Sequence, residues 1–358
     1  MHFFDTINFD HMGIAGLSGW VIILILLALF FDFLNGFHDA ANAVATIVST
    51  RVLSPQVAVC VAAVCNLIAF LLFQLNVAET MGTGIIDPQI ADEAVIGAAL
   101  IAACSWDLIT WYYGLPTSSS HALIGGLVGA ALVKIGPSAL VWEWGLKTLP
   151  MTLVFIFVAP LIGFLAGLAI AVATTWAFRR STPRQVDKFF RIGQLFSMMF
   201  YSVGHGGNDA QKTMGVIFVL LLAAQAPLKL NEQKKPIVPT EVVLACSVAM
   251  GVGTLFGGWR IVKTLGQRLI KLKPVDGFCA ESGAAATLLL TIFGGVPVST
   301  THTITGAIYG VGTARHRLSA VRWGLAGRVL WAWVLTIPAA AIVSAMSWYI
   351  LRLFSAGP

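Results

Sequence analysis

Two short stretches of the sequence gather hydroxyl side chains inside otherwise apolar surroundings. The first, GLPTSSSHALIGG, runs from residue 114 to 126, and the second, GVPVSTTHTITGA, runs from 295 to 307. In both, a proline precedes a histidine by five residues, with Ser and Thr between them. Proline ends one helix and fits the first turn of the next, whose start carries free backbone N–H groups and the positive end of the helix dipole. Each stretch therefore predicts an anion site. The predicted hydroxyl donors are Thr117, Ser118, Ser119, Ser120, Ser299, Thr300 and Thr301.

Two further stretches match each other, and each carries an aspartate. GFHDAANA begins at residue 36 and GGNDAQKT begins at residue 206, so Asp39 and Asp209 are equivalent. Glycine weakens a helix, so the glycines before each aspartate predict an unwound segment with free carbonyls. The order of the motifs is the same in both halves of the chain, with the aspartate first and the hydroxyl cluster later.

These aspartates and the amides beside them suit a cation. Carboxylate, amide and free carbonyl oxygens are the ligands that a hard cation such as sodium requires, whereas a carboxylate alone would carry a proton. We therefore predict a coupling-cation site, with Asp39 and Asp209 as the metal ligands if the cation is sodium. The alternative is structural, with each carboxylate capping a broken helix or pairing with Lys212. The predicted site comprises Asp39, Asn42, Asn208 and Asp209.

The repeat is unequal at one position, where Asn42 in the first half becomes Lys212 in the second. A fixed ammonium there would replace a bound cation or neutralise Asp209, so the two halves would not bind cations equally. His38 stands where the second half has Asn208, next to the aspartate. Because histidine titrates near neutral pH, His38 is a candidate for proton coupling.

The composition places these motifs in a membrane. The chain has 358 residues, of which 58% are hydrophobic and 11% charged, whereas soluble domains carry about 25% charged residues. Mainly apolar runs long enough to span a bilayer recur along the whole chain. The net charge of +6 comes from basic residues in short loops, which indicates membrane topology and not nucleic-acid binding. We predict a multi-pass protein of the cell (inner or plasma) membrane, embedded in the lipid bilayer.

Charged loops set the orientation of the chain. Segments 179–191, 260–273 and 315–322 are rich in Lys and Arg and are expected inside. Segment 77–93 holds four acidic residues and no Lys or Arg, and is expected outside. The two halves then run in opposite senses. This predicts an all-α polytopic protein of two inverted-topology repeats, each with a broken first helix and a re-entrant helical hairpin. The predicted units are a first repeat at 1–180, a short cytoplasmic linker at 181–190 and a second repeat at 191–358.

The hydroxyl clusters lie at the predicted hairpin tips. The second limb of each hairpin is about 17 residues long, which is marginal for a full span. Two tips meeting near the midplane would clasp a tetrahedral oxyanion from both sides. His121 and His302 follow the clusters, either as proton relays or as hydrogen-bonding groups across the hairpins. Ionisable residues inside spans are expensive and are therefore functional candidates, which adds Asp32, Asp107 and Glu281. His205 has no counterpart in the first half and is interpreted as structural.

The motifs NGFHDAANAVAT (from Asn35), GHGGNDAQKTMGV (from Gly204), GLPTSSSH and GVPVSTTH closely resemble the inorganic phosphate transporter (PiT) family. The resemblance spans nearly the whole chain. It implies a dimeric all-helical symporter that moves phosphate with Na+ or H+ and has no other cofactor. It also implies that the tip hydroxyls contact phosphate, that Gln211 reaches toward the anion, and that Glu281 gates or couples transport. Histidine at position 38 resembles the bacterial, proton-coupled, low-affinity branch.

Other functions fit parts of the sequence. Sulfate is the main rival substrate, because hydroxyls and a helix dipole do not by themselves separate two tetrahedral oxyanions. Only phosphate, however, can donate a hydrogen bond to an acceptor such as Asp or Gln. An anion channel could use the same hairpins. An intramembrane hydrolase is disfavoured, because Ser120 and His121 are neighbours in sequence and cannot readily form a nucleophile–base pair on a helix.

Overall fold

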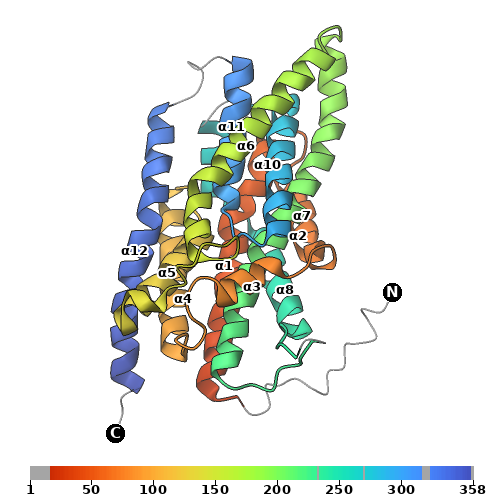
Figure 1. Cartoon of the computed structure of the whole chain (residues 1–358). Helices are drawn as coiled ribbons and strands as arrows, with labels where there is room; N and C mark the ends of the chain where they lie inside the picture. Colours follow the sequence, from red (N-terminus) through yellow and green to blue (C-terminus); the bar gives the residue numbers. More distant parts are fainter. Residues whose placement is uncertain (1–16, 232–233, 269–270, 317–322, 356–358) are drawn as a thin grey trace.

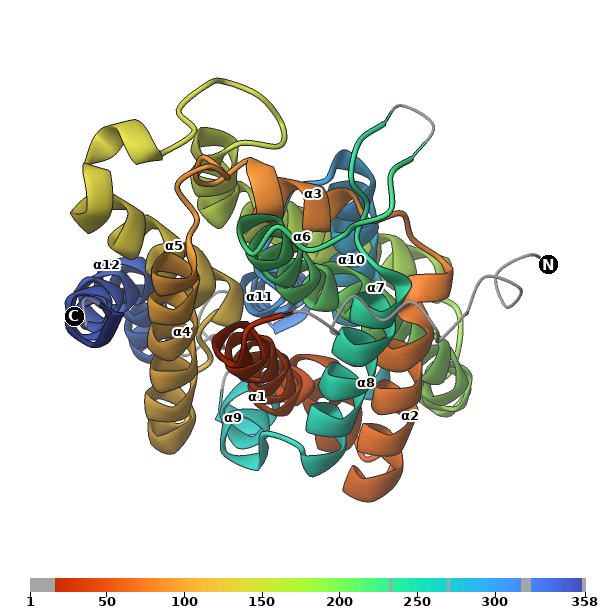
Figure 2. The ribbon, with the colours of Figure 1, turned by 90° about the horizontal axis from the view of Figure 1, so that it is seen from below.

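The computed structural model describes residues 17–231, 234–268, 271–316 and 323–355, and their regular structure is helical apart from isolated β-bridges. Figures 1 and 2 show the bundle from the side and from below. In chain order the elements are α1 (Gly19–Ser49), α2 (Pro55–Ile68), η3 (Ala69–Leu71), α3 (Asn76–Thr83), α4 (Glu93–Tyr113), α5 (Ser119–Ile135), η4 (Pro137–Ala139), α6 (Leu149–Ala177), α7 (Pro183–Ala223), α8 (Thr240–Phe256), α9 (Trp259–Lys263), η5 (Thr264–Arg268), α10 (Pro274–Gly294), α11 (Thr300–His316) and α12 (Trp323–Ser355).

The two halves contain the same series of elements. Each begins with a long helix, α1 or α7, and these two run in opposite directions (Figure 1). A bent pair follows, with a bend of 80° between α2 and α3 and of 59° between α8 and α9. Each half then has a helical hairpin, α4–α5 or α10–α11, and ends on a long apolar helix, α6 or α12. The all-helical fold and the paired series of elements agree with the prediction.

The halves are interlocked through their hairpins. The second limb of each hairpin packs on the last helix of the other half, α5 on α12 and α11 on α6. Glycines allow this close approach, because a Cβ atom on Gly129 would lie 2.3 Å from the Ala341 carbonyl oxygen, and one on Gly310 would lie 2.0 Å from that of Phe164. Small residues at such crossings are typical of membrane helix packing. The hairpin tips are thereby fixed inside the bundle.

The helix breaks are not where the sequence analysis predicts them. Both α1 and α7 continue through their aspartate motifs, so neither first helix is broken. The glycines instead allow neighbouring backbones to approach. A Cβ atom on Gly36 would lie 2.2 Å from the Met250 carbonyl oxygen, and one on Gly206 would lie 2.6 Å from the Cα atom of Asn66. The breaks lie in the second elements of the halves, α2–α3 and α8–α9.

The predicted linker at 181–190 is mostly helical, because α7 begins at Pro183. A capping box starts this helix, with the Thr182 hydroxyl accepting from the Gln185 N–H and the Gln185 side chain accepting from the Thr182 N–H. Proline at the first position adds to the same signal. The helix therefore starts several residues earlier than the predicted boundary of the second repeat.

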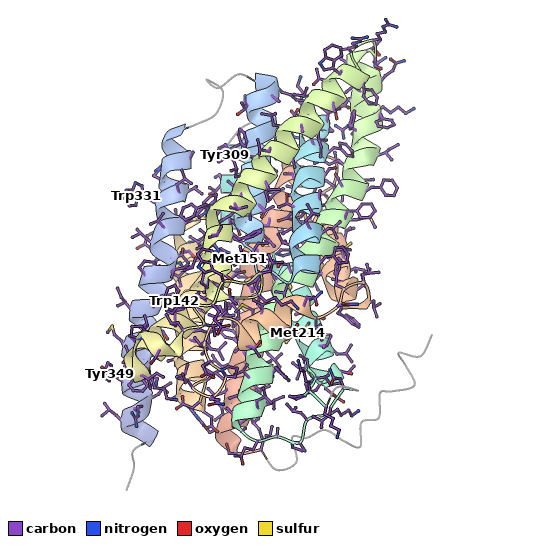
Figure 3. All side chains as sticks on the ribbon, in the orientation of Figure 1. Trp142, Met151, Met214, Tyr309, Trp331 and Tyr349 are labelled. Atoms are coloured by element: carbon purple, nitrogen blue, oxygen red, sulfur yellow. The ribbon has the colours of Figure 1, made fainter. Side chains whose placement is uncertain are left out.

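The distribution of polar residues is that of a membrane protein. Among the described residues, five helices, α1, α4, α6, α10 and α12, are long and apolar enough to cross a bilayer. Large apolar side chains face outward, as Trp331 and Tyr349 on α12 show (Figure 3). Several charged side chains are nevertheless buried inside the bundle, namely Asp32, Asp39, Asp107, Asp209, Lys212 and Glu281. The chain is a multi-pass membrane protein.

Candidate functional site

Each hairpin tip is a helix start built as the sequence predicts. α4 and α10 are followed by the capping residues Gly114 and Gly295, whose φ angles of 65° and 68° are left-handed and favour glycine. α5 and α11 then begin at matched positions. The Ser118 hydroxyl accepts from the backbone N–H of His121, and the Ser299 hydroxyl accepts from that of His302, both at 3.2 Å.

The two tips meet at mid-height in the bundle, where the hairpins arrive from opposite ends (Figure 1). The His121 and His302 rings lie edge to face with centroids 4.6 Å apart. The ammonium of Lys212 on α7 joins the tips, since it donates to the Ser120 hydroxyl of the first and, at 2.7 Å, to the Val298 carbonyl of the second. The tips therefore form one site.

Both aspartates lie at the start of α11. The Thr300 hydroxyl is 2.9 Å from Asp209 Oδ2 and 3.4 Å from Asp39 Oδ2, so it bridges the two carboxylates. Asn42 donates to the Thr301 hydroxyl at 2.8 Å. Asp209 also forms an ion pair with Lys212. A site for the predicted cation and a site for the predicted anion therefore share the side chains of one helix start.

Two amide oxygens near the carboxylates could serve as ligands for a cation. The Asn208 NH2 group donates to Asp209 Oδ1 and to the Val298 carbonyl oxygen, both at 2.9 Å. Both partners are acceptors, which determines the orientation of the amide. Across the described part of the chain, Asn42 Oδ1 and Asn208 Oδ1 are buried without a hydrogen-bond partner. Orphaned acceptors next to carboxylates are what a bound cation would use.

His205 also belongs to this cluster, although the sequence analysis interprets it as structural. Its Nε2 atom lies 3.1 Å from Asp209 Oδ2, and its Nδ1 atom lies 3.2 Å from Asn66 Oδ1. Ligand atoms of Asp39, His205 and Asp209 all lie within 4.8 Å of one another. The signal in the sequence is the spacing, because His205 precedes Asp209 by four residues and helical residues four apart share a face.

His38 is positioned between two helices. Its Nδ1 atom lies 2.7 Å from Asp39 Oδ1, and its Nε2 atom lies 3.2 Å from the Thr110 hydroxyl on α4. That hydroxyl also donates to the Trp106 carbonyl at 2.9 Å. When it does, Nε2 must donate to Thr110, and a further proton must lie between Nδ1 and Asp39. In this geometry the pair shares one proton between His38 Nδ1 and Asp39 Oδ1.

The two tips differ in which hydroxyls are free. Among the described residues, Thr117 and Ser119 at the first tip have buried hydroxyls without a hydrogen-bond partner. At the second tip, Thr300 and Thr301 are engaged with carboxylates and with Asn42. Among the described residues, the unpaired hydroxyls of the two capping segments are thus concentrated at the first tip.

Two predicted residues lie outside this cluster. The Gln211 amide oxygen accepts from the N–H groups of Val77 and Ala78, at 3.0 and 3.3 Å, and its NH2 group donates to the Gln74 carbonyl at 3.0 Å. Gln211 thus caps α3, which the resemblance does not imply, and among the described residues it has no hydrogen bond to a tip hydroxyl.

Glu281 forms a second buried polar cluster. It accepts from Thr46 on α1 and from Gln194 and Ser197 on α7, with a Gln194 distance of 3.0 Å. Three neutral donors on two other helices thus hold one carboxylate of α10. This arrangement ties the hairpin to the first helix of both halves.

Two aromatic residues that the sequence analysis misses support the tips. Trp333 on α12 stacks on His302 with ring centroids 3.8 Å apart and donates from its indole N–H to the Pro116 carbonyl at 3.0 Å. Tyr201 on α7 donates to the Thr300 carbonyl at 3.2 Å. Tyr201 precedes Asp209 by eight residues and so shares its helix face, but no local signal marks Trp333.

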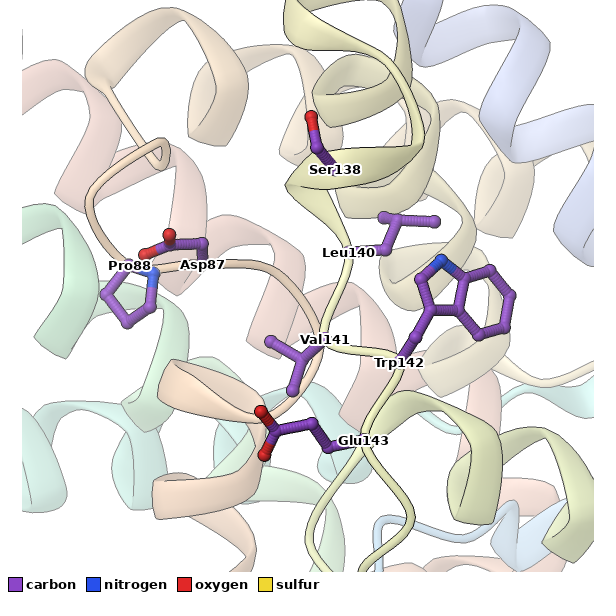
Figure 4. A pocket seen from close by; sticks show the side chains of 7 residues that line it. All are labelled: Asp87, Pro88, Ser138, Leu140, Val141, Trp142 and Glu143. Atoms are coloured by element: carbon purple, nitrogen blue, oxygen red, sulfur yellow. The ribbon is translucent and has the colours of Figure 1, made fainter.

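An open pocket of about 540 Å³ lies elsewhere, between the loops that precede α4 and α6 (Figure 4). It contains none of the hydroxyls or carboxylates of the hairpin tips. Its wide opening and loop lining are those of a surface hollow, so the chemistry of the tips locates the functional site better than the size of a pocket does. The lining residues are Asp87, Pro88, Ser138, Leu140, Val141, Trp142 and Glu143.

Comparison with known proteins gives one consistent result. Residues 35–344 match the model of a family described as the phosphate transporter family. The chain is 58% identical over 326 residues to a probable low-affinity inorganic phosphate transporter of Rhizobium meliloti (strain 1021), covering 91% of this chain and 95% of that protein. It is 42% identical over 334 residues to a protein of the same description in Bacillus subtilis (strain 168), covering 93% and 97%.

A solved structure described as the sodium-dependent phosphate transporter has the same fold. Its TM-score is 0.82 at 24% sequence identity, and the match covers 94% of this chain and 100% of that one. At this identity the likeness concerns the fold alone.

Proposed function

Since the chain belongs to the phosphate transporter family, we propose that it imports inorganic phosphate by symport with a cation, H+ or Na+, through alternating access. Phosphate transport follows from the family. The family and the relatives are transporters, so the chain is not an enzyme. The coupling and the mechanism are inferred from the site.

One observation carries the proposal: Thr300 at the second hairpin tip bridges the carboxylates of Asp39 and Asp209. The anion would bind the helix starts of α5 and α11, through their N–H groups and hydroxyls. The cation would bind the carboxylates and the orphaned amide oxygens of Asn42 and Asn208. Both ligands would then share the start of α11.

Charge explains why the two ligands would travel together. Two like unit charges about 5 Å apart repel by roughly 3 kcal/mol at an effective dielectric constant near 20. A phosphate at the tips would meet this repulsion from Asp39 and Asp209, which lie beside Thr300. A cation on the carboxylates removes the repulsion, so each ligand raises the affinity for the other. Lys212 compensates part of the same charge permanently.

The repeat architecture suits alternating access. Transporters built from inverted repeats place the substrate between the halves and expose it to one side at a time. Here the hairpins arrive from opposite ends, and each packs on the other half. Equivalent hairpins therefore flank the site from the two sides of the membrane. This arrangement would allow the site to open toward either side in turn.

Uptake of labelled phosphate into vesicles containing the purified protein tests the proposal. A sodium gradient and a proton gradient are imposed separately, and each is collapsed in a matched control with the corresponding ionophore. We expect accumulation above equilibrium with one of the two gradients and loss of accumulation when it is collapsed. Equilibration without accumulation under either gradient would mean a channel or a uniporter, and the symport proposal would be wrong.

A further inference from the structure

One buried carboxylate near the hairpin tips has no role in the site described above. Asp107 lies on α4, two turns before the end of that helix, and is 1% exposed. Neither of its carboxylate oxygens has a hydrogen-bond partner among the described residues. A buried carboxylate without a donor is costly, so a native protein that keeps one needs it for a ligand, an ion or a proton.

The surroundings of Asp107 belong to the first tip. The Ser119 hydroxyl, at the start of α5, interacts with the carboxylate but without the geometry of a full hydrogen bond, and it has no other hydrogen-bond partner in the described part of the chain. The charged groups that interact with Asp107 electrostatically are His38, Asp39 and Asp209. Within the described ranges, no Lys or Arg forms a salt bridge with it. The free hydroxyl and the free carboxylate thus stand side by side.

The other half of the molecule lacks this carboxylate. Asp107 precedes Pro116 by nine residues, and the residue nine before Pro297 is Leu288. The buried Leu288 packs in the apolar core of the second half. Asp107 is therefore not part of the repeated framework. The carboxylates at the second tip already hold the Thr300 hydroxyl, whereas Asp107 adds an acceptor at the first tip.

Donors and an acceptor together distinguish oxyanions. At neutral pH phosphate carries at least one proton and can donate a hydrogen bond, whereas sulfate carries none and only accepts. At a site with hydroxyl donors alone, both anions fit. A carboxylate beside the donors would accept from a P–OH group but would repel sulfate, which has no proton to offer.

We propose that Asp107 is a specificity-determining residue that accepts a hydrogen bond from a P–OH group of bound phosphate and excludes sulfate. The proposal rests on phosphate binding at the hairpin tips, as proposed above. It adds an acceptor to a site of hydroxyl and N–H donors, and it gives the unpartnered carboxylate a function.

Equilibrium binding of labelled phosphate to the purified full-length protein tests this, with sulfate, arsenate and monofluorophosphate as competitors. Arsenate carries protons at neutral pH, as phosphate does, whereas monofluorophosphate resembles sulfate in carrying none. In the unmodified protein, arsenate should compete well. Sulfate and monofluorophosphate should bind at least about tenfold more weakly than arsenate, because neither can donate the hydrogen bond to the buried carboxylate. Competition by monofluorophosphate equal to that by arsenate would overturn the proposal without any mutation.

The variant D107N sharpens the test. Its amide has nearly the same shape and can donate to sulfate, so the ratio of sulfate to phosphate affinity should rise by about tenfold or more, while arsenate still competes. D107S gives the same comparison if the amide is not tolerated. D32N is the matched control, because Asp32 is also buried with an oxygen that lacks a partner among the described residues, while its other oxygen accepts from Thr213 and not from a tip hydroxyl. It should keep the original selectivity.

The outcomes separate the two proposals. If the unmodified protein does not bind phosphate, the proposed function fails. If it binds phosphate but D107N and D107S leave the ratio of sulfate to phosphate affinity unchanged, only the role of Asp107 is wrong.

Discussion

The two hairpin tips have the same local structure but different chemical surroundings. Both begin a helix at a serine-capped turn that follows a left-handed glycine. Among the described residues, the hydroxyls of Thr117 and Ser119 at the first tip and the nearby carboxylate of Asp107 have no hydrogen-bond partner, whereas the hydroxyls of the second tip engage Asp39 and Asp209. A duplicated framework thus supplies two equivalent helix starts, and the residues around them assign one mainly to the anion and the other to both ligands.

The largest effect is expected at the second tip from loss of its carboxylate. D209N removes a carboxylate that is proposed to bind the cation, and it leaves the buried Lys212 ammonium without its ion-pair partner. Losing one member of a buried ion pair costs about 3–5 kcal/mol. We expect coupled uptake to fall by about a hundredfold or more, measured in vesicles at equal protein content. D32N should leave uptake largely intact, and wild-type uptake by D209N would remove the cation site from the proposal.

The packing of both hairpins against the opposite half can be tested by substituting the glycines at the helix crossings. G129A and G310A would place a Cβ atom 2.3 and 2.0 Å from a backbone oxygen of the opposite half. Such overpacking costs about 1–3 kcal/mol. Both variants should lower the thermal unfolding temperature in detergent to a similar degree, whereas G19A, with no atom within 4 Å, should not. Stability unchanged in both hairpin variants would contradict the interlocked packing.

Single hydroxyls should separate the roles of the tips. S119A removes a free donor at the first tip, so phosphate affinity should fall by about tenfold while the cation dependence of uptake stays the same. T300A removes the bridge between the carboxylates, so both the phosphate affinity and the cation concentration for half-maximal uptake should change. The measurement is uptake over a grid of phosphate and cation concentrations. Identical effects of the two variants would mean that the tips do not differ in role.

The smallest effect is expected from removing the serine caps, and the loss of stability should be equal at the two tips. S118A and S299A each remove one hydrogen bond to a helix start, at His121 or His302. Loss of a capping serine costs about 1 kcal/mol. Thermal unfolding of the two variants should therefore shift by similar small amounts, and S118T and S299T should restore most of the loss. Unequal shifts would show that the tips differ already at the level of the caps.

Much of the architecture is readable from local signals. The turn after Gly114, the serine caps and the matched motifs of the two halves are encoded within a few residues each, so both hairpins and the inverted order of elements are predictable. The glycines at 36 and 206 mislead, because a glycine that breaks a helix and one that admits a neighbouring backbone look the same in a sequence. Only the packing partner distinguishes the two uses.

The sequence alone determined the membrane environment, the two hairpins and the set of ionisable residues that they could bring together. The tertiary structure alone decided how these residues pair: Lys212 between the tips, Thr300 across the two carboxylates, His205 beside Asp209, and Asp107 beside Ser119 with no full hydrogen bond among the described residues. The physical reason is the distance along the chain between the residues that interact. Caps and turns are set by contacts within a few residues, whereas a buried charge finds its partner on a helix that is distant in the chain, through the packing of the two halves.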